Sequence, residues 1–189
     1  MEVSDHEWMD RLAKGEDLAL NELMDRWSER VTSFLYRMIG QRDTAIDLAQ
    51  ETFVKLYQAR ERYRPTGSFS SYLFSIASNL AKNYVRWIAK HPTVSMDAPQ
   101  TDGSDWAAEL VDPVRSPDTS AEVAEKMRAV NAVFLQLPTD LKEAMSLYIY
   151  EGLSYSESAA IAECTPKAIE TRIYRARQIL RERLQEFTE

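Results

Sequence analysis

Apolar side chains recur three or four positions apart along most of this 189-residue sequence. That spacing places them on one face of an α-helix, so the pattern predicts helices rather than strands. The predicted helices form two groups, first residues 8–15, 17–39, 43–60 and 68–90, and then 120–136, 139–151, 154–163 and 165 to nearly the end. We therefore expect an all-α protein made of two small helical domains.

The two groups are separated by a segment with four prolines and an excess of acidic residues. Its prolines are Pro92, Pro99, Pro113 and Pro117, and its acidic residues Asp97, Asp102, Asp105, Glu109, Asp112 and Asp118 are opposed only by Arg115. This composition predicts an extended, self-repelling linker over residues 92–119, between domains at 1–91 and 120–189. A capping box from Thr119 to Glu122 would start the second domain. A solvated tether without further function fits the linker equally well.

The charge of the chain limits what it can bind unaided. The net charge is −7 and the isoelectric point is about 5.0. Non-specific affinity for nucleic acid comes from neutralising phosphates, so any DNA contact must be local or assisted by a partner.

The N-terminal residues lack a basic, apolar leader, and no stretch approaches the roughly 20 apolar residues of a membrane span. We expect a cytoplasmic protein without membrane insertion.

The second domain contains the pattern of a helix-turn-helix. Ser154 and Glu157 have the spacing of a capping box at the start of a short helix, and a tight break follows at Glu163. Thr165 can cap the next helix, and Pro166 suits its first position because the missing amide has no intrahelical partner there. A short helix, a tight turn and a longer capped helix together predict this motif.

The longer helix has an apolar face and a polar face. Ile169, Ile173, Ala176, Leu180 and Leu184 form one stripe, while Lys167, Glu170, Thr171, Tyr174 and Arg175 lie on or beside the opposite side. An α-helix fits the DNA major groove, where such polar side chains can contact base edges or phosphates. The alternative is a surface helix whose charges pair within the helix.

The predicted helix at 43–60 also has two distinct sides. Ile46, Ala49, Phe53, Leu56 and Tyr57 form the apolar stripe, and Asp47, Glu51, Val54 and Gln58 form the other side, with Gln50 at its border. The second side is acidic and partly apolar. It is either a solvated helix face or a docking surface for a basic partner.

The predicted helix at 68–90 combines aromatic, amide and basic side chains. Its core stripe is Phe69, Leu73, Ile76, Leu80 and Tyr84, and its far side is Ser71, Ser75, Ser78, Lys82 and Arg86, flanked by Tyr72, Asn79, Asn83 and Lys90. Such a mixture suits single-stranded DNA, because bases stack on aromatic rings and cations hold the backbone. A helix whose aromatic residues simply pack is the alternative. Trp87 lies close to the core stripe, and we expect it to pack there.

Three stretches resemble a known family. DLAQETF at residues 47–53 and GSFSSYLFSIASNLA at 67–81 resemble region two of extracytoplasmic-function (ECF) sigma factors of the sigma-70 family. LSYSESAAIAEC at 153–164, followed by IETRIYRAR at 169–177, is similar to their region four. The resemblance implies a subunit that binds core RNA polymerase and promoter DNA, and that is commonly controlled by an anti-sigma factor.

The resemblance also implies roles for individual residues. A first group would dock on the clamp of the polymerase's largest subunit: Asp47, Leu48, Gln50, Glu51 and Val54. Region four would meet the flap of the second subunit. A second group would capture the melted −10 element, with a flipped base received beside the loop at 64–68: Ser68, Tyr72, Asn79, Lys82, Asn83 and Arg86. A third would contact the −35 duplex: Thr165, Lys167, Glu170, Thr171, Arg172, Tyr174 and Arg175. The linker would follow the path by which RNA leaves the enzyme.

Two residues depart from the family pattern. Glu170 stands where members commonly carry Lys or Arg, so it cannot hold a phosphate and could instead accept a hydrogen bond from a cytosine amino group. Glu163 stands where the turn often has Gly, so we expect a strained or differently shaped turn.

Catalysis has little support in the sequence. Neither a Gly-rich phosphate loop nor a cluster of metal ligands is present, and His6 and His91 lie far apart, so we expect no cofactor, no metal and no enzymatic activity. Three other hypotheses remain at this point. They are a helix-turn-helix regulator with a sensing or dimerising first domain, a protein-interaction module with vestigial DNA surfaces, and, more distantly, a nucleic-acid enzyme.

Overall fold

The computed structural model describes residues 3–91 and 121–185, with the backbone alone for 121–124. In these ranges the regular elements are all helical, which confirms the all-α prediction. The first group is α1 (Asp5–Ala13), α2 (Leu18–Ile39), α3 (Arg42–Gln58), the single turn η1 (Arg60–Arg62) and α4 (Phe69–Lys90). The second is α6 (Ala121–Leu135), α7 (Thr139–Met145), η2 (Ser146–Tyr150), α8 (Tyr155–Ile161) and α9 (Pro166–Gln185). The predicted linker and the capping residue Thr119 lie outside the described residues.

The helices begin and end close to the residues that the sequence signals indicate. Ser68 caps α4 by accepting a hydrogen bond from the amide of Ser71. Ser154 and Glu157 form the full capping box of α8, and Gly40 ends α2 in the left-handed conformation with φ of 81°. The predicted helix at 139–151 differs, because at Ser146 it widens into the π-helical turn η2.

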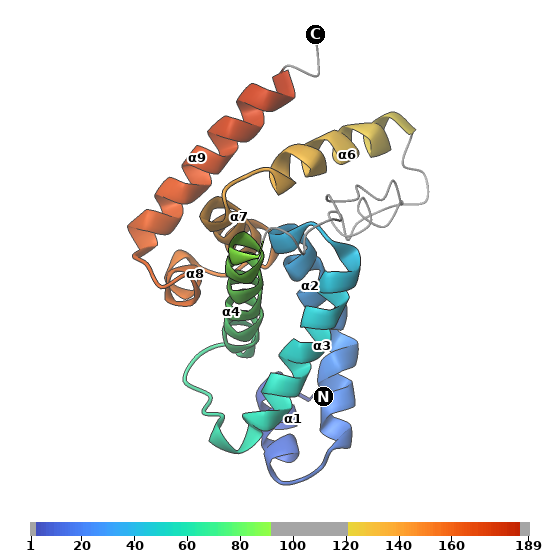
Figure 1. The fold of residues 1–189 in the computed structure, drawn as a ribbon. Helices are drawn as coiled ribbons and strands as arrows, with labels where there is room; N and C mark the ends of the chain where they lie inside the picture. The colour runs from blue at the N-terminus through green and yellow to red at the C-terminus, as the bar shows by residue number, and fades with distance from the viewer. Residues whose placement is uncertain (1–2, 92–120, 186–189) are drawn as a thin grey trace.

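The first four α-helices enclose one apolar core (Figure 1). Its largest fully buried side chains come from all four helices: Met9, Leu12, Leu23, Phe34, Leu56, Leu73 and Phe74. The Phe34 and Phe74 rings pack with their centroids 5.2 Å apart. Burying large apolar side chains from every helix is the main favourable contribution to folding, so α3 and α4 are held firmly by their inner faces.

The second group is organised around α9. Ile169, Ile173 and Ala176 are buried against α7 and α8, as the predicted apolar stripe requires. Between α8 and α9 the chain turns at Glu163, whose φ of 52° is the left-handed conformation that favours glycine. The turn is therefore mildly strained at this residue. The α8–turn–α9 unit is the predicted helix-turn-helix.

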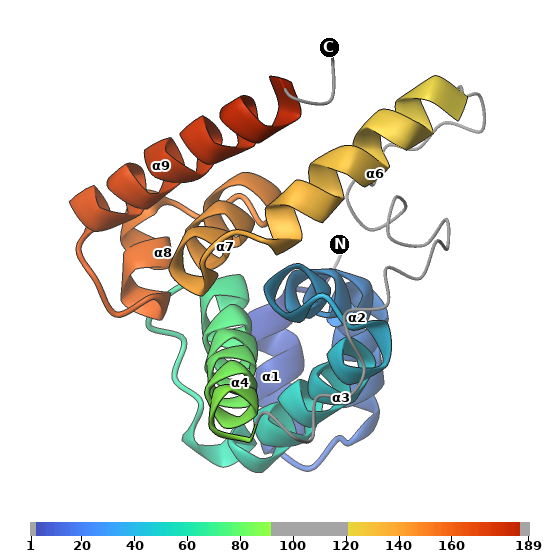
Figure 2. The same cartoon turned by 45° about the horizontal axis from the view of Figure 1, so that its top comes forward.

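The two groups of helices pack directly against each other. Leu147, Leu153 and Ile161 belong to the second group by sequence, yet they are buried in the same apolar cluster as the first group. In both views α8 and α7 lie beside α4 (Figures 1 and 2). The outer face of α4 is therefore partly covered by the second group of helices, which contacts Ser71, Ser78 and Lys82 while Arg86 stays exposed.

The expectation that Trp87 packs into the core is wrong. Its side chain is 44% exposed and stacks on His91, with 5.0 Å between the ring centroids. Trp87 lies in the last turn of α4, nearly two turns beyond Leu80 and Ala81, which are buried. At this end α4 extends past the core. Helical spacing puts Trp87 close to the apolar stripe, but there is no core left there for its side chain to pack against.

Candidate nucleic-acid interface

The outer face of α3 is open to solvent. Asp47, Gln50 and Glu51 are exposed, Val54 is 52% exposed, and Leu48 is half-buried at the edge of the face. The opposite face of α3 holds the helix in the core through Ala49, Phe53 and Leu56. Glu51 pairs with Lys55 one turn on, at 3.5 Å, and both side chains are about half exposed. The predicted docking residues thus form one continuous acidic and partly apolar surface, which we call the α3 face.

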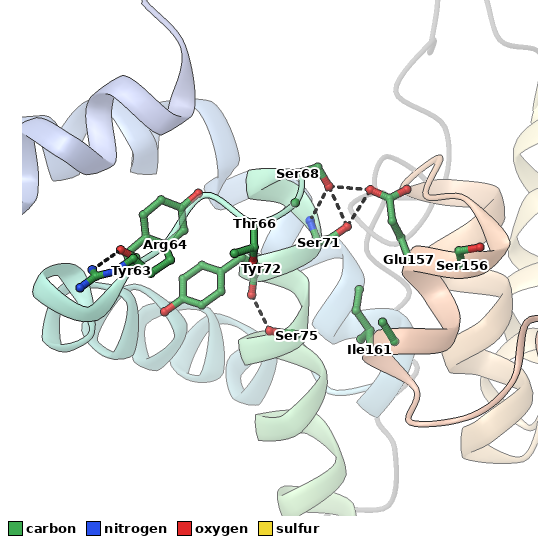
Figure 3. A pocket seen from close by; sticks show the side chains of 12 residues that line it. Tyr63, Arg64, Thr66, Ser68, Ser71, Tyr72, Ser75, Ser156, Glu157 and Ile161 are labelled. Carbon is green, nitrogen blue, oxygen red and sulfur yellow. Dashed lines mark hydrogen bonds between the residues drawn. The ribbon is translucent and has the colours of Figure 1, made fainter.

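A cavity of about 420 Å³ lies where α4 begins (Figure 3). From the first group of helices it is lined by Tyr63, Arg64, Thr66, Gly67, Ser68, Ser71, Tyr72 and Ser75. Its other wall is α8, through Ser156, Glu157, Ala160 and Ile161. The predicted −10 residues Ser68 and Tyr72 therefore line one cavity together with the loop at 64–68. The aromatic and hydroxyl groups in its wall suit a planar, hydrogen-bonding ligand.

Tyr63 is a lining residue that the sequence reasoning missed. Its ring lies against that of Tyr72, with 5.0 Å between centroids, and its hydroxyl hydrogen-bonds Nδ1 of His6 at 2.6 Å. Burial, reinforced by Tyr72, raises the pKa of Tyr63 to about 12. Burial likewise raises the pKa of Tyr72. Both phenols therefore stay protonated and neutral near pH 7. A tyrosine directly before the loop at 64–68 was the available signal.

Farther along α4, the predicted −10 residues separate into two environments. Asn79, Asn83 and Arg86 are exposed, and Arg86 Nη2 donates to Asn83 Oδ1 at 2.9 Å. Lys82 is only partly exposed, because its Nζ lies 3.2 Å from the carboxylate of Glu143 on α7. A strand reaching α4 would find the amides accessible and Lys82 already paired.

Glu157 of α8 binds the start of α4 (Figure 3). Its Oε1 accepts hydrogen bonds from Ser68 Oγ at 2.7 Å and Ser71 Oγ at 2.9 Å. These bonds, led by that of Ser68, and those from Ser154 lower the pKa of Glu157 to about 2. The hydroxyl groups of Ser68 and Ser71 at the rim of the cavity therefore donate hydrogen bonds to an ionised carboxylate.

Most of the predicted −35 residues lie on the exposed side of α9. Thr165, Lys167, Glu170, Tyr174 and Arg175 are exposed, and Thr171 is half-buried with its hydroxyl bonded to the Lys167 carbonyl. Lys167 Nζ pairs with Glu170 at 2.7 Å, so the unusual acid at this position has a local partner. Arg172 differs, because it contacts Asp140 at 3.5 Å and the sulfur of Cys164. These contacts connect α9 to α7 and to the turn.

The structure also contains polar contacts between the two groups that the sequence reasoning did not predict. Glu151 in the segment after η2 lies 2.5 Å from Arg37 and 3.1 Å from Arg30, both on α2. Glu143 accepts a hydrogen bond from the buried Ser78 of α4. Lys142 Nζ donates to the carbonyl of Met38 at 2.7 Å. Nothing in local sequence signals such pairs, because their partners are 65 to 121 residues apart.

Among residues 3–91 and 121–185, none of the helices is long and apolar enough to cross a membrane. Over the same ranges, three or more His, Cys, Asp or Glu side chains do not gather in a way that could hold a metal ion.

Comparison with known proteins gives the same two parts in the same order. The family model for Sigma-70 region 2 matches residues 23–89, which include α3 and nearly all of α4. The family model for Sigma-70, region 4 matches residues 127–180, which include α8, the turn and most of α9. The remaining hypotheses of a simple regulator or an enzyme do not account for region 2.

Relatives match over nearly the whole chain. The ECF RNA polymerase sigma-E factor of Haemophilus influenzae is 32% identical over 185 residues, covering 97% of each chain. That of Escherichia coli K12 is 31% identical over 185 residues, covering 97% of this chain and 96% of the relative.

Two solved structures share the fold. The sigma factor RpoE of Bartonella quintana, in complex with the anti-sigma factor NepR, has a TM-score of 0.65 and 24% identity, and the match covers 87% of this chain and 96% of that one. CnrH, in complex with the cytosolic domain of CnrY, has a TM-score of 0.66 and 24% identity over 96% of this chain and 97% of that one. With the region 2 and region 4 matches and the sigma-E relatives, this chain belongs to the ECF sigma factors of the sigma-70 family, the non-catalytic RNA polymerase subunits that direct transcription initiation.

Proposed function

We propose that this sigma factor docks on core polymerase through the α3 face, captures the −10 element as a melted strand along α4, and reads the −35 element as duplex through α9. The observation that carries the proposal is the presence of three differently composed surfaces on one chain: an acidic α3 face, an aromatic cavity with amides beside it, and a polar recognition helix. We assign region 2 to residues 1–91, the linker to 92–119 and region 4 to 120–189.

Docking through the α3 face is supported by its chemistry. Asp47 and Glu51 give it negative charge, and the exposed Val54 adds apolar area beside them. Charge complementarity to a basic partner speeds encounter, and apolar area adds affinity. The partner surface is the clamp of the largest polymerase subunit, and the flap of the second subunit receives region 4. Docking also supplies the positive surface that a net charge of −7 denies the free protein.

Capture of the −10 strand is supported by the cavity at the start of α4. Its volume of about 420 Å³ falls in the roughly 300–1,000 Å³ range of small-molecule sites. Tyr72, backed by the buried Tyr63, offers a ring face for stacking, and Asn79, farther along α4, offers an amide for reading a base edge. A base leaving the duplex must overcome stacking, which a pocket of this kind offsets. Strand capture therefore favours promoter opening.

Reading of the −35 duplex is supported by the exposed side of α9. Tyr174 is 62% exposed, and Lys167, Glu170 and Arg175 project from the same helix. Lys and Arg can contact guanine edges or phosphates, and Glu can accept from a cytosine amino group. Arg172 remains in the predicted set, although its contacts within the protein favour a role in orienting the helix.

Control by an anti-sigma factor completes the proposal. It is supported by the fold shared with a sigma factor that was solved bound to an anti-sigma factor. Such a partner would act by competing for the surfaces assigned here to polymerase and promoter. The acidic linker, outside the described residues, would follow the RNA exit path of the holoenzyme.

The decisive experiment is transcription in vitro with purified core polymerase and fragments of the source genome. We expect specific start sites that need both this protein and core enzyme. Specific duplex binding without polymerase, and no specific starts with it, would support the helix-turn-helix regulator instead.

Two variants test whether duplex binding and promoter opening depend on different regions. Arg175→Ala on α9 should weaken holoenzyme binding to duplex −35 DNA by about 1–3 kcal/mol, the value of one bidentate contact between a side chain and a base. Asn79→Ala on α4 should leave that duplex step intact and slow promoter opening, measured by permanganate reactivity of unpaired thymines. An equal effect of both variants on both steps would contradict the division.

A further inference from the structure

The ring that is proposed to stack on a base rests on Tyr63, the residue directly before the cavity loop. Tyr63 follows η1, is 8% exposed, and packs against two rings of α4. Its ring centroid lies 5.0 Å from that of Tyr72 and 6.4 Å from that of Phe69. Phe69 is buried in the core, whereas Tyr72 is half-buried and lines the cavity (Figure 3). Tyr63 therefore connects the core to the Tyr72 ring.

The cavity loop at 64–68 is also attached to Tyr63. Nη1 of Arg64 donates hydrogen bonds to the carbonyl of Tyr63 at 2.8 Å and to that of Glu61 at 3.2 Å. The amide of Thr66 donates to the carbonyl of Arg64 at 2.8 Å. These bonds join the first half of the loop to the backbone around Tyr63. A displacement of Tyr63 would therefore move both the Tyr72 ring and the loop.

The hydroxyl group of Tyr63 is held from α1. It lies 2.6 Å from Nδ1 of His6, and the two rings stack with 6.0 Å between centroids and 28° between planes. Apolar packing is non-directional, whereas a hydrogen bond at the far end of the phenol restricts the tilt of the ring. A mostly buried hydroxyl also costs free energy when it loses its partner. The position of Tyr63 therefore depends on His6.

The first turn of α1 is anchored well enough to hold His6 in place. Met9 and Leu12, one and two turns farther along the helix, are 0% exposed in the core. Beside His6, the carboxylate of Asp5 pairs with Arg26 of α2 at 2.8 Å. The helix is thus fixed both to the core and to α2, so His6 approaches Tyr63 from a rigid element.

We propose that His6 is a positioning residue of the −10 site: its hydrogen bond to Tyr63 sets the angle of the Tyr72 ring and the start of the loop at 64–68, so that α1 contributes to strand capture without contacting DNA. This inference rests on the proposed assignment of the cavity to the −10 strand. A binding group works well only when its supporting residues hold it in the productive geometry. The effect of His6 is confined to promoter opening, because other elements form the α3 face and the recognition helix.

Two substitutions of His6 separate its hydrogen bond from its ring. His6→Phe keeps an aromatic ring against Tyr63 and removes Nδ1. His6→Asn removes the ring, but the side-chain amide places a hydrogen-bonding atom where Nδ1 stands, one bond beyond Cγ. If the hydrogen bond positions Tyr63, Asn should replace His and Phe should not.

The test follows promoter opening by the holoenzyme on a fragment found in the transcription experiment above, through the permanganate reactivity of unpaired thymines over time. The dependence of the rate on holoenzyme concentration separates the affinity of the first duplex complex from the rate of opening within it. We expect His6→Phe to slow opening within the complex by about three- to ten-fold, the value of one hydrogen bond, and to leave the duplex affinity unchanged. His6→Asn should open within about two-fold of the wild-type rate, because the bond is kept.

The control on the same helix is Glu7→Gln, which alters the exposed residue next to His6. It should open at the wild-type rate. Equal slowing by Glu7→Gln and His6→Phe would show a general effect of α1 and overturn the inference. Failure of His6→Asn to restore opening would overturn it as well.

A double-mutant cycle with Tyr63→Phe tests whether His6 acts through the hydroxyl. Tyr63→Phe should slow opening about as much as His6→Phe does, and the double variant should be no slower than either single variant. Single effects that multiply would contradict the inference. A role of His6 in folding alone would instead lower assembly with core polymerase, duplex affinity and opening together, and that result would also overturn it.

Tyr72→Ala tells failure of this inference apart from failure of the proposed function. If Tyr72→Ala slows opening and His6→Phe does not, the positioning role alone is rejected. If opening is insensitive to Tyr72→Ala, the assignment of the cavity to the −10 strand is rejected, and the positioning role falls with it.

Discussion

The outer faces of α3 and α4 belong to the same helical domain, and both are proposed to meet large partners. Asp47, Gln50 and Glu51 of α3 are exposed, whereas Ser78 of α4 is fully buried under region 4 and Lys82 is engaged by Glu143. The difference lies in the partner chemistry of each face. The α3 face is mainly acidic and repels the carboxylates of region 4, while the donors of α4 bind them.

The comparison shows how acids of one region can occupy the hydrogen-bond donors of the other region in an acidic protein. Donors that suit phosphate also suit Glu, so the α4 face that we propose for DNA can be contacted by the chain's own acids. The lowered pKa of Glu157, about 2, reflects this use: four hydrogen bonds from Ser68, Ser71 and Ser154 favour its charged form.

The largest effect should come from reversing a charge on the α3 face. Glu51→Arg places a cation where a basic partner is proposed to dock, and like charges across an interface cost several kcal/mol. We expect the Kd for core polymerase to rise on the order of 100-fold, measured by fluorescence titration, with folding changed by less than about 0.5 kcal/mol. Glu22→Arg on α2 provides the matched reversal outside the face. Equal assembly of wild type and Glu51→Arg would remove the α3 face from the polymerase interface.

A smaller change tests whether the α4 face is covered. On an open helix face Ser78→Ala should stabilise slightly, by about 0.5 kcal/mol or less, because Ala has the higher helix propensity. Under region 4 it removes a buried hydrogen bond to Glu143, so we expect a loss of about 1.5–3 kcal/mol in the free energy of unfolding, measured in urea. The neighbouring exposed Asn79→Ala is the control. The sign of the Ser78→Ala change decides between an open and a covered face.

The smallest expected effect is a pH dependence carried by Glu157. Its pKa is lowered from 4.5 to about 2, so the stabilisation by its ionised form is fully present above pH 4.5 and is lost as the pH falls toward 2. Solvent around this partly exposed side chain reduces the magnitude. The stability difference between wild type and Glu157→Gln should therefore shrink between about pH 6 and about pH 3. A difference that stays constant over this range would show that the bonds to Ser68 and Ser71 do not persist in solution.

Much of this protein follows from local rules that the sequence carries by itself. Ser68 and Ser154 start helices because a side-chain oxygen beside free amides suffices, and Gly40 ends one because it adopts a positive φ without strain. The apolar stripe of α9 and the exposed acids of α3 follow from helical spacing in the same way.

Only the tertiary structure decided which of the polar helix faces of region 2 are covered by another part of the chain. Helical spacing placed Ser78 and Lys82 on an outer face, and that is correct for region 2 alone, but region 4 packs there. The Glu151–Arg37 pair joins residues 114 positions apart, and Tyr63 meets His6 across 57. Periodicity describes how one helix divides into two sides. Which of its sides meets another part of the chain depends on packing and charge pairing between segments that share no local pattern.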